Sequence, residues 1–185
     1  MKIAIVGAEE SKWNKTQKAW AQYHIINILV NPCVISYKGE SEGYCRTDFD
    51  PRRVTLISGH CPKGGVDIWA EEIADFYKIN KEIYKPDVNQ WDDIRGRSED
   101  WEFGKPRHPI IKKGYRSRNI QIAKACDVLY CIVPKVKLSA MLIDTKLTRD
   151  NMCIHCEKAR HSTNGGCWTM KYARKLGKET HLIVI

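Results

Sequence analysis

Short runs of aliphatic residues alternate along this chain with longer segments whose apolar residues recur at helical spacing. No other feature of the sequence limits the fold so strongly. Continuous aliphatic strands separated by amphipathic helices are typical of a parallel sheet that is covered on both faces. The sequence therefore predicts an α/β fold, a three-layer sandwich with a mainly parallel sheet of about five strands.

The individual elements follow from composition and spacing. The expected strands are the aliphatic runs 2–7, 53–59, 81–86, 127–133 and 180–185. Helices are expected from a cap within 11–14 to residue 30, and then at 66–77, 117–125 and 167–176.

Three polar segments do not fit the alternation, and they are 31–51, 87–114 and 134–166. A chain of 185 residues is expected to form one domain, 1–185. We place the three segments as long connections on its rim, where loops carry function on a rigid scaffold. For 31–51, an insertion that the fold merely tolerates is the alternative.

The net charge of +9 and the isoelectric point near 9.1 favour an anionic partner. A phosphorylated small molecule, a nucleic acid and an acidic protein all meet this preference. No segment resembles a signal peptide and no apolar run is long enough to cross a bilayer, so we expect a cytoplasmic protein without a membrane partner. In a reducing cytoplasm the eight cysteines are not expected to form a disulfide framework.

The stretch LISGHCPKGGVDIWAEEIADFY, residues 56–77, joins a predicted strand to a predicted helix through a turn with Gly59, Gly64 and Gly65. Glycines in this place allow a sharp turn and let backbone N–H groups approach a ligand closely; phosphate suits such a turn. Their spacing matches neither the dinucleotide-binding fingerprint nor the Walker motif. We interpret the turn as a candidate anion site.

Asp67 and Glu71 are four residues apart, so both lie on one face of the helix after the turn. In a functional interpretation these carboxylates hydrogen-bond ribose hydroxyls or transfer protons, which makes them the candidate catalytic residues. In a structural interpretation Asp67 complements the helix dipole and the other charges form a solvated face. The spacing alone favours neither.

Two further segments precede predicted helices. In the first, cations gather where they oppose the helix dipole, so an anion bound between them would relieve the conflict. These cations are Lys112, Lys113, Arg116 and Arg118. The second segment, STNGGCWTMKYARKLGK, places the Gly165–Gly166 pair before a helix, and we assign its apolar stripe to the core rather than to a ligand platform. The stripe consists of Trp168, Tyr172, Ala173 and Leu176.

Candidate metal ligands are concentrated near the last predicted helix, and they are Cys153, Cys156, His161 and Cys167. A C-x2-C pair suits two ligands of a tetrahedral zinc ion, and a nearby histidine and cysteine close the shell. His155 and Cys131 are substitutes for the fourth ligand, and a set of free thiols is the alternative to a metal. A structural zinc would stabilise a polar insertion with little core of its own, and would fix the loop around Gly165 and Gly166.

These motifs together resemble a known superfamily. ISGHCPKGGVDIWAEEIA, then RSRN before CDVLYCIV, then NGGCWTMKYARKLGKETHLIVI are similar to the SLOG superfamily of Lonely Guy phosphoribohydrolases, DNA processing protein A and YspA-related proteins. The likeness covers most of the chain outside the three connections and is strongest to the YspA-related group. The pattern of that group maps onto Ser58, Gly59, Gly65, Asp67, Ala70, Glu71, Arg118 and Asn119, with His60 where a second glycine is usual.

The resemblance implies a Rossmann-like fold, a nucleotide or nucleotide-derived phosphorylated ligand at the carboxyl ends of the strands, and a homo-oligomer. Some members are sensors, and others hydrolyse the bond between base and ribose phosphate. The hydrolases carry a glutamate near the position of Tyr172, and its absence favours binding or sensing here. With the glycine-rich turn, the resemblance suggests as ligand-binding residues Gly7, Ser58, Gly59, Lys63, Gly64, Gly65, Arg118, Asn119, Gly165, Gly166 and Thr169.

Three functions remain open at this stage. The first is a binding or sensor module for a nucleotide-like small molecule. The second is a hydrolase that cleaves the N-glycosidic bond of such a ligand, with Asp67 or Glu71 as acid or base. The third is DNA or RNA binding, which the positive charge favours, although no compact aromatic and basic recognition motif supports it.

Overall fold

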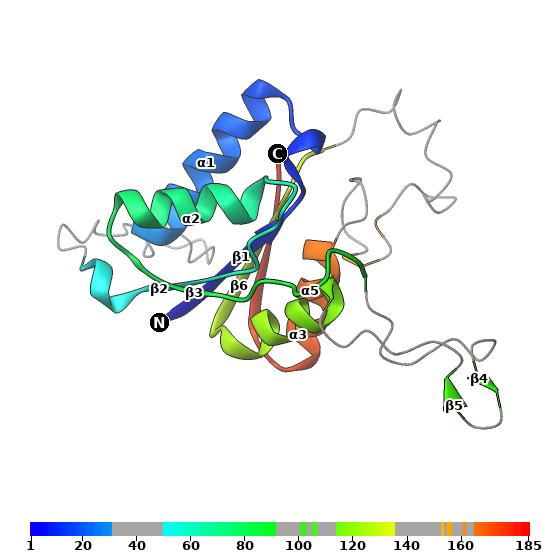
Figure 1. Cartoon of the computed structure of the whole chain (residues 1–185). Coiled ribbons are helices and arrows are strands. Elements are labelled where there is room, and N and C mark those ends of the chain that lie inside the picture. Colours follow the sequence, from blue (N-terminus) through cyan, green and yellow to red (C-terminus); the bar gives the residue numbers. More distant parts are fainter. Residues whose placement is uncertain are drawn as a thin grey trace.

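A five-stranded parallel sheet organises the fold (Figure 1). The structure is a computed structural model that describes residues 1–30, 50–91, 101–102, 105–106, 114–135, 153, 155–156, 161 and 165–185. Across the sheet the strands are, in order, β3 (Asn80–Ile83), β2 (Thr55–Ser58), β1 (Lys2–Gly7), β6 (Val128–Val133) and β7 (Glu179–Val184). Every neighbouring pair is parallel, which confirms the predicted α/β architecture.

The most apolar strands, β1 and β6, lie inside the sheet. All residues of β6 are buried, and so are residues 3–6 of β1. Ala4 of β1 is in register with Ile57 of β2 on one side and with Leu129 of β6 on the other. Because both faces of these strands are apolar, the sheet is stable only when helices cover it on both sides.

Two pairs of helices provide that cover (Figure 1). One face carries α1 (Lys15–Val30) and α2 (Val66–Phe76), and the other carries α3 (Tyr115–Ala125) and α5 (Gly165–Lys175). The first core includes Ile5, Ile25 and Trp69, and the second includes Ile57, Ile122 and Met170. The sheet between two separate cores is the predicted three-layer sandwich.

The cap expected within 11–14 is present. After a short 3-10 helix, η1 (Glu10–Lys12), the side chain of Asn14 accepts a hydrogen bond from the backbone N–H of Gln17 at 2.8 Å. This bond satisfies one of the N–H groups that the first turn of α1 leaves without an intrahelical partner.

The element boundaries differ from the predicted ones by a few residues. The third strand ends at Ile83, and the second is confined to Thr55–Ser58 after the 3-10 helix η3 (Pro51–Arg53). A short antiparallel pair, β4 (Trp101–Glu102) and β5 (Lys105–Pro106), lies within the predicted connection 87–114. Most of the three connections, with Lys112 and Lys113, lies outside the described residues.

The glycine-rich turn before α2 packs against the end of β1. Gly65 has φ 95° and ψ −150°, a backbone conformation that only glycine adopts readily. The N–H of Val66 donates to the carbonyl oxygen of Ala8 at 3.3 Å, and a Cβ on Gly65 would overlap that same oxygen. The turn therefore needs glycine for its conformation and for its close approach to the loop after β1.

We expect Gly65→Ala to lower the free energy of unfolding by about 2–5 kcal/mol, since it adds backbone strain and a steric clash. Gly177→Ala is the matched control, because Gly177 also has a positive φ, 74°, but a Cβ there would meet nothing within 4 Å. It should cost only about 1–2 kcal/mol. Urea denaturation of both variants measures the difference, and equal losses would show that the contact with Ala8 does not matter.

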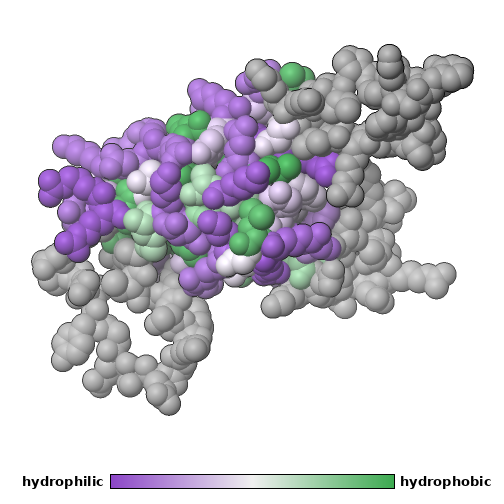
Figure 2. Space-filling view, turned by 90° about the horizontal axis from the view of Figure 1, so that it is seen from below, coloured by the Kyte–Doolittle hydropathy of each residue, from purple (hydrophilic) through white to green (hydrophobic). Residues whose placement is uncertain are grey.

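The described surface in Figure 2 is mostly hydrophilic, with hydrophobic residues scattered between charged ones. Such scattering is ordinary for a protein surface. Among the described helices, none combines the length and the hydropathy needed to span a bilayer. Among the described cysteines there is no disulfide bond, and Cys33 and Cys45 lie outside the described residues.

Candidate ligand pocket and cysteine–histidine cluster

A pocket of about 180 Å³ lies where β1 ends. From β1 the chain continues to β2 and β3 on one side of the sheet, and later to β6 and β7 on the other. The boundary between β1 and β6 is therefore a switch point of the strand order, and open α/β sheets bind ligands outside the carboxyl ends of the strands at such a point.

The pocket collects many of the predicted site residues. Those in its wall are Gly7, Lys63, Asp67, Arg118, Asn119, Gly165, Gly166 and Thr169. The remaining predicted residues are not among the described lining residues, and they are Ser58, Gly59, Gly64, Gly65 and Glu71. Gly64 and Gly65 face the loop after β1, where a Cβ on either would meet Glu10 or Ala8, and Cys61 and Lys63 are the residues of this turn that line the pocket.

Arg118 is the central cation of this pocket. Arg118 is only 8% exposed. Its guanidinium donates one hydrogen bond to the carbonyl oxygen of Gly59 at 2.6 Å and another to the carboxylate of Asp67 at 3.3 Å. The absence of a side chain at Gly59 makes room for it, since a Cβ there would overlap the guanidinium. The buried Nε of Arg118 has no hydrogen-bond partner within the described part of the chain.

Asp67 lies on α2 and is 7% exposed. Burial raises the pKa of its carboxyl, while Arg118 and a hydrogen bond from the backbone N–H of Gly7 act in the opposite direction. Asp67 is thus a buried acid at the pocket wall, held in place by a cation. The burial of Glu71, which is also 7% exposed, excludes the interpretation in which it belongs to a solvated helix face, whereas Asp67 does lie in the first turn of α2, where it can complement the helix dipole.

Glu71 lies one turn further along α2 and is also buried. Its carboxylate accepts a hydrogen bond from the hydroxyl of Ser58 at 2.6 Å and lies 2.8 Å from Nδ1 of His60. His60, in turn, has a positive φ of 49°. Glu71 therefore fixes the first part of the glycine-rich turn through side-chain contacts behind the pocket.

The N-terminus of α5 forms another part of the wall through Gly165 and Gly166. The side chain of Asn119 donates to the carbonyl oxygen of Gly165 at 3.4 Å, and the hydroxyl of Thr169 donates to the same oxygen at 2.7 Å. These bonds hold the first turn of the helix in place. The first N–H groups of a helix lack intrahelical partners and carry a partial positive charge, so this end of α5 suits an anion.

Sequence reasoning missed several residues of the wall. They are Val6, Ala8, Glu9, Lys12, Cys61, Trp91 and Tyr115. Glu9 and Lys12 follow a strand's carboxyl end directly, and the rule for open sheets would have indicated them. Trp91 and Tyr115 follow no periodic pattern that marks them.

The chemistry of two missed residues is clear from their contacts. The carboxylate oxygens of Glu9 lie 3.4 Å from Nζ of Lys63 and 3.8 Å from Nζ of Lys12. Glu9 therefore holds both lysines at the pocket rim. Burial, reinforced by the charge of Asp67, raises the pKa of the Cys61 thiol. Cys61 therefore stays protonated at neutral pH and is not an activated nucleophile.

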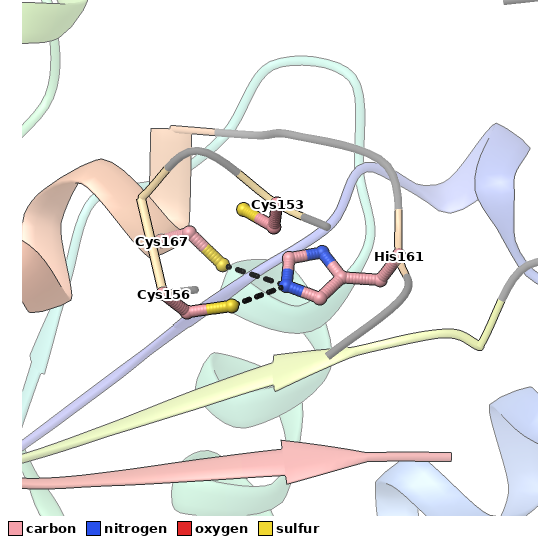
Figure 3. Close-up of side chains that lie close together, drawn as sticks. All are labelled: Cys153, Cys156, His161 and Cys167. Carbon is pink, nitrogen blue, oxygen red and sulfur yellow. Dashed lines mark hydrogen bonds between the residues drawn. The ribbon is translucent and has the colours of Figure 1, made fainter. Parts of the chain in front are cut away.

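A second cluster lies beside α5 and consists of Cys153, Cys156, His161 and Cys167 (Figure 3). All of them are buried, and their ligand atoms lie within 4.8 Å of one another. Nε2 of His161 is 3.1 Å from the sulfur of Cys156 and 3.4 Å from that of Cys167. The described residues thus bring together the four predicted metal ligands.

The distances in this cluster fit a tetrahedral metal site. With a Zn–S bond of about 2.3 Å and a Zn–N bond of about 2.0 Å, a sulfur and a nitrogen ligand lie roughly 3.5 Å apart. The distances of 3.1 and 3.4 Å from Nε2 of His161 to the two sulfurs are comparable. The sulfur of Cys131 lies 3.7 Å from that of Cys167, but Cys131 belongs to β6. Neither Cys131 nor His155 is part of the group of four. The cluster could hold a metal ion, and its Cys3His donor set would supply four ligands.

The thiols of the cluster differ in acidity. Hydrogen bonding with Cys167 and His161 lowers the pKa of Cys153, whereas contacts with Cys131 and Cys153 raise the pKa of Cys167. The buried group therefore favours one thiolate, and further thiolates would need a cation to compensate them. Because Cys167 directly follows Gly165 and Gly166, any ion held here would also fix this part of the pocket wall.

Comparisons with known proteins give one structural likeness. No protein-family model and no curated protein sequence matches the chain. Among solved structures, the chain is similar to DNA processing protein A from Streptococcus pneumoniae, with a TM-score of 0.49 and 14% sequence identity. The match covers 98% of this chain and 49% of that protein, so the chain spans about half its length.

Proposed function

We propose that this chain binds a nucleotide or a nucleotide-derived phosphorylated ligand in the pocket at the end of β1, as a sensor or binding module. The observation that carries the proposal is Arg118, whose buried Nε lacks a partner within the described residues. A buried unsatisfied donor is costly, and an anion bound to this guanidinium at the pocket wall would offset part of that cost. A phosphate group suits a guanidinium because it accepts charge-assisted hydrogen bonds.

The surroundings of Arg118 support a phosphorylated sugar rather than a bare anion. Lys12, Lys63 and the N-terminus of α5 add positive potential at the same pocket. Asp67 supplies an acceptor for a ribose hydroxyl in the functional interpretation of the sequence. The volume of about 180 Å³ is smaller than the roughly 300–1,000 Å³ of pockets that enclose drug-sized ligands. The described pocket would thus enclose a ribose phosphate, with the rest of the ligand at its rim.

We further propose that the Cys3His cluster holds zinc in a structural role. Three sulfur donors and one imidazole are the ligands that zinc prefers in closed tetrahedral sites. A full shell leaves no position for water or substrate, so the ion would stabilise the fold and the α5 end of the pocket without taking part in chemistry.

Isothermal titration calorimetry tests the binding proposal. The panel is inorganic phosphate, ribose 5-phosphate, a series of nucleoside mono- and diphosphates, and ADP-ribose. We expect ribose 5-phosphate and at least one nucleotide to bind more tightly than inorganic phosphate. If no sugar phosphate binds better than phosphate itself, the proposal is wrong. A steep loss of DNA affinity with rising salt would then favour nucleic-acid binding.

A second candidate function is hydrolysis of the N-glycosidic bond of the bound nucleotide, and the raised pKa of Asp67 at the pocket wall favours it. A carboxyl with a raised pKa keeps its proton to a higher pH than an ordinary carboxyl does, as a general acid requires. Liquid chromatography of the incubated panel would reveal a released base. In that case Asp67→Asn should end base release while the nucleotide still binds, whereas Glu71, which faces Ser58 and His60, should not be the acid or base.

A further inference from the structure

An exposed indole stands at the rim of the pocket. Trp91 is 45% exposed and lines the pocket, next to the N-terminus of α5. A Cβ placed on Gly165 would lie 4.0 Å from its ring. A large aromatic surface left open to solvent beside a cationic site is a candidate contact for a ligand, because burying such a ring is strongly favourable.

The ring of Trp91 packs against an aromatic side chain of α5. It meets Trp168 of α5 edge to face, with centroids 5.3 Å apart and planes at 86°, and Trp168 is stacked on Tyr172 at 5.4 Å. The neighbouring residue, Gln90, accepts a backbone hydrogen bond from Tyr115 at the start of α3 at 2.9 Å. These contacts connect Trp91 to two helices that form the pocket, so the indole is positioned relative to the phosphate-binding groups.

We infer that Trp91 is a stacking platform for the base of the bound nucleotide, and this inference rests on the proposed nucleotide function. A phosphate at Arg118 and the N-terminus of α5 would place an attached ribose beside Gly165, and a base on that ribose would extend toward Trp91. Every nucleobase has a face that can stack on an indole, and purines offer the larger one. The ligand class is therefore a nucleotide with an aromatic base, and purine nucleotides should bind more tightly than pyrimidine nucleotides.

The test compares adenosine 5′-monophosphate with ribose 5-phosphate by isothermal titration calorimetry on the full chain. We expect Trp91→Leu to weaken binding of the nucleotide by roughly 5- to 150-fold, the range of base–aromatic stacking. Binding of ribose 5-phosphate should change by less than about twofold, because this ligand has no base to stack. Trp91→Phe should restore most of the nucleotide affinity.

Trp20→Leu is the matched control. Trp20 is 53% exposed on α1 and is not among the residues that line the pocket, so both ligands should bind this variant as they bind the wild type. If Trp91→Leu leaves the nucleotide affinity unchanged, or weakens both ligands equally, the stacking role is wrong while the nucleotide site stands. If neither ligand binds the wild type, the proposed function falls and the stacking role falls with it.

Discussion

Loss of the proposed zinc from the cysteine–histidine cluster is expected to lower the free energy of unfolding by more than about 4 kcal/mol. For a chain of this size that corresponds to a fall of roughly 8–16 °C in the unfolding midpoint. Cys156→Ser removes one ligand of the buried set, and a strong chelator removes the ion itself. The reason for the large effect is that the binding free energy of a structural zinc is available only to the folded chain.

Three measurements check this expectation. Elemental analysis should find about one zinc per chain in the wild type and almost none in Cys156→Ser. The chelator should lower the midpoint of thermal unfolding of the wild type but not that of the variant. Calorimetry should show weaker nucleotide binding after metal loss, because Cys167 connects the cluster to the pocket wall.

Cys126→Ser provides the matched control for the cluster. Cys126 is a buried thiol that donates to the carbonyl oxygen of Ala123 and lies outside the group of four. Its substitution should cost only about 1 kcal/mol and leave the zinc content unchanged. A wild type that contains no zinc and ignores the chelator would contradict the proposal, as would equal losses of stability in the two cysteine variants.

Arg118→Met is expected to affect both stability and binding. It leaves the carboxylate of Asp67 buried without its cation, which should lower the free energy of unfolding by about 3–5 kcal/mol near neutral pH. It also removes the proposed phosphate partner, so nucleotide affinity should fall at least about tenfold. Arg52→Met is the control, since it removes the same charge from a side chain that is 85% exposed.

The loss in Arg118→Met should depend on pH in a defined direction. The pKa of Asp67 in the folded chain is raised above its ordinary value of about 3.9. The ordinary value applies to the unfolded chain. At a pH between the unfolded-state and the folded-state pKa, the unfolded chain has released the proton that the folded chain still holds, so the free energy of unfolding falls as pH rises. Without Arg118 the folded-state pKa of Asp67 is higher still. The difference in stability between variant and wild type should therefore grow as pH rises from the folded-state pKa of the wild type to that of the variant, and should stay constant above both.

Urea denaturation over a pH series measures this difference, and Asp67→Asn in the Arg118→Met background provides the decisive comparison. An amide does not ionise, so the double variant should be more stable than Arg118→Met at neutral pH and should lose the additional pH dependence. If the double variant is the less stable of the two, then the buried carboxylate is not the source of the destabilisation.

The sequence predicts the layers of this fold well, because each depends on a local pattern. The run from Val128 to Val133 is apolar on both faces, which is enough to identify a strand covered on both sides. The boundaries were harder to predict, and the third strand ends at Ile83, three residues before Pro86. The cysteine–histidine cluster could also be predicted, because the spacing of Cys153 and Cys156 is itself a signal.

The pocket could be predicted only in part, because its geometry depends on distant contacts. The burial of Asp67 depends on Arg118, and that of Glu71 on the hydroxyl of Ser58 and on His60. No local pattern reports such pairs. Trp91 belongs to no periodic segment, so only the packing against Trp168 reveals its place at the rim.

The strand order has a consequence for how this protein is made. Strand β1 is synthesised first, yet one of its two neighbours is β6, which begins at Val128. The pocket wall runs from Val6 to Thr169. Contacts between residues so far apart in the chain form slowly, because the chain loses the entropy of a long loop before these contacts stabilise the fold. A ribosome-bound chain cannot form this site until Thr169 has left the exit tunnel, so ligand capture would report that synthesis and folding have both reached α5.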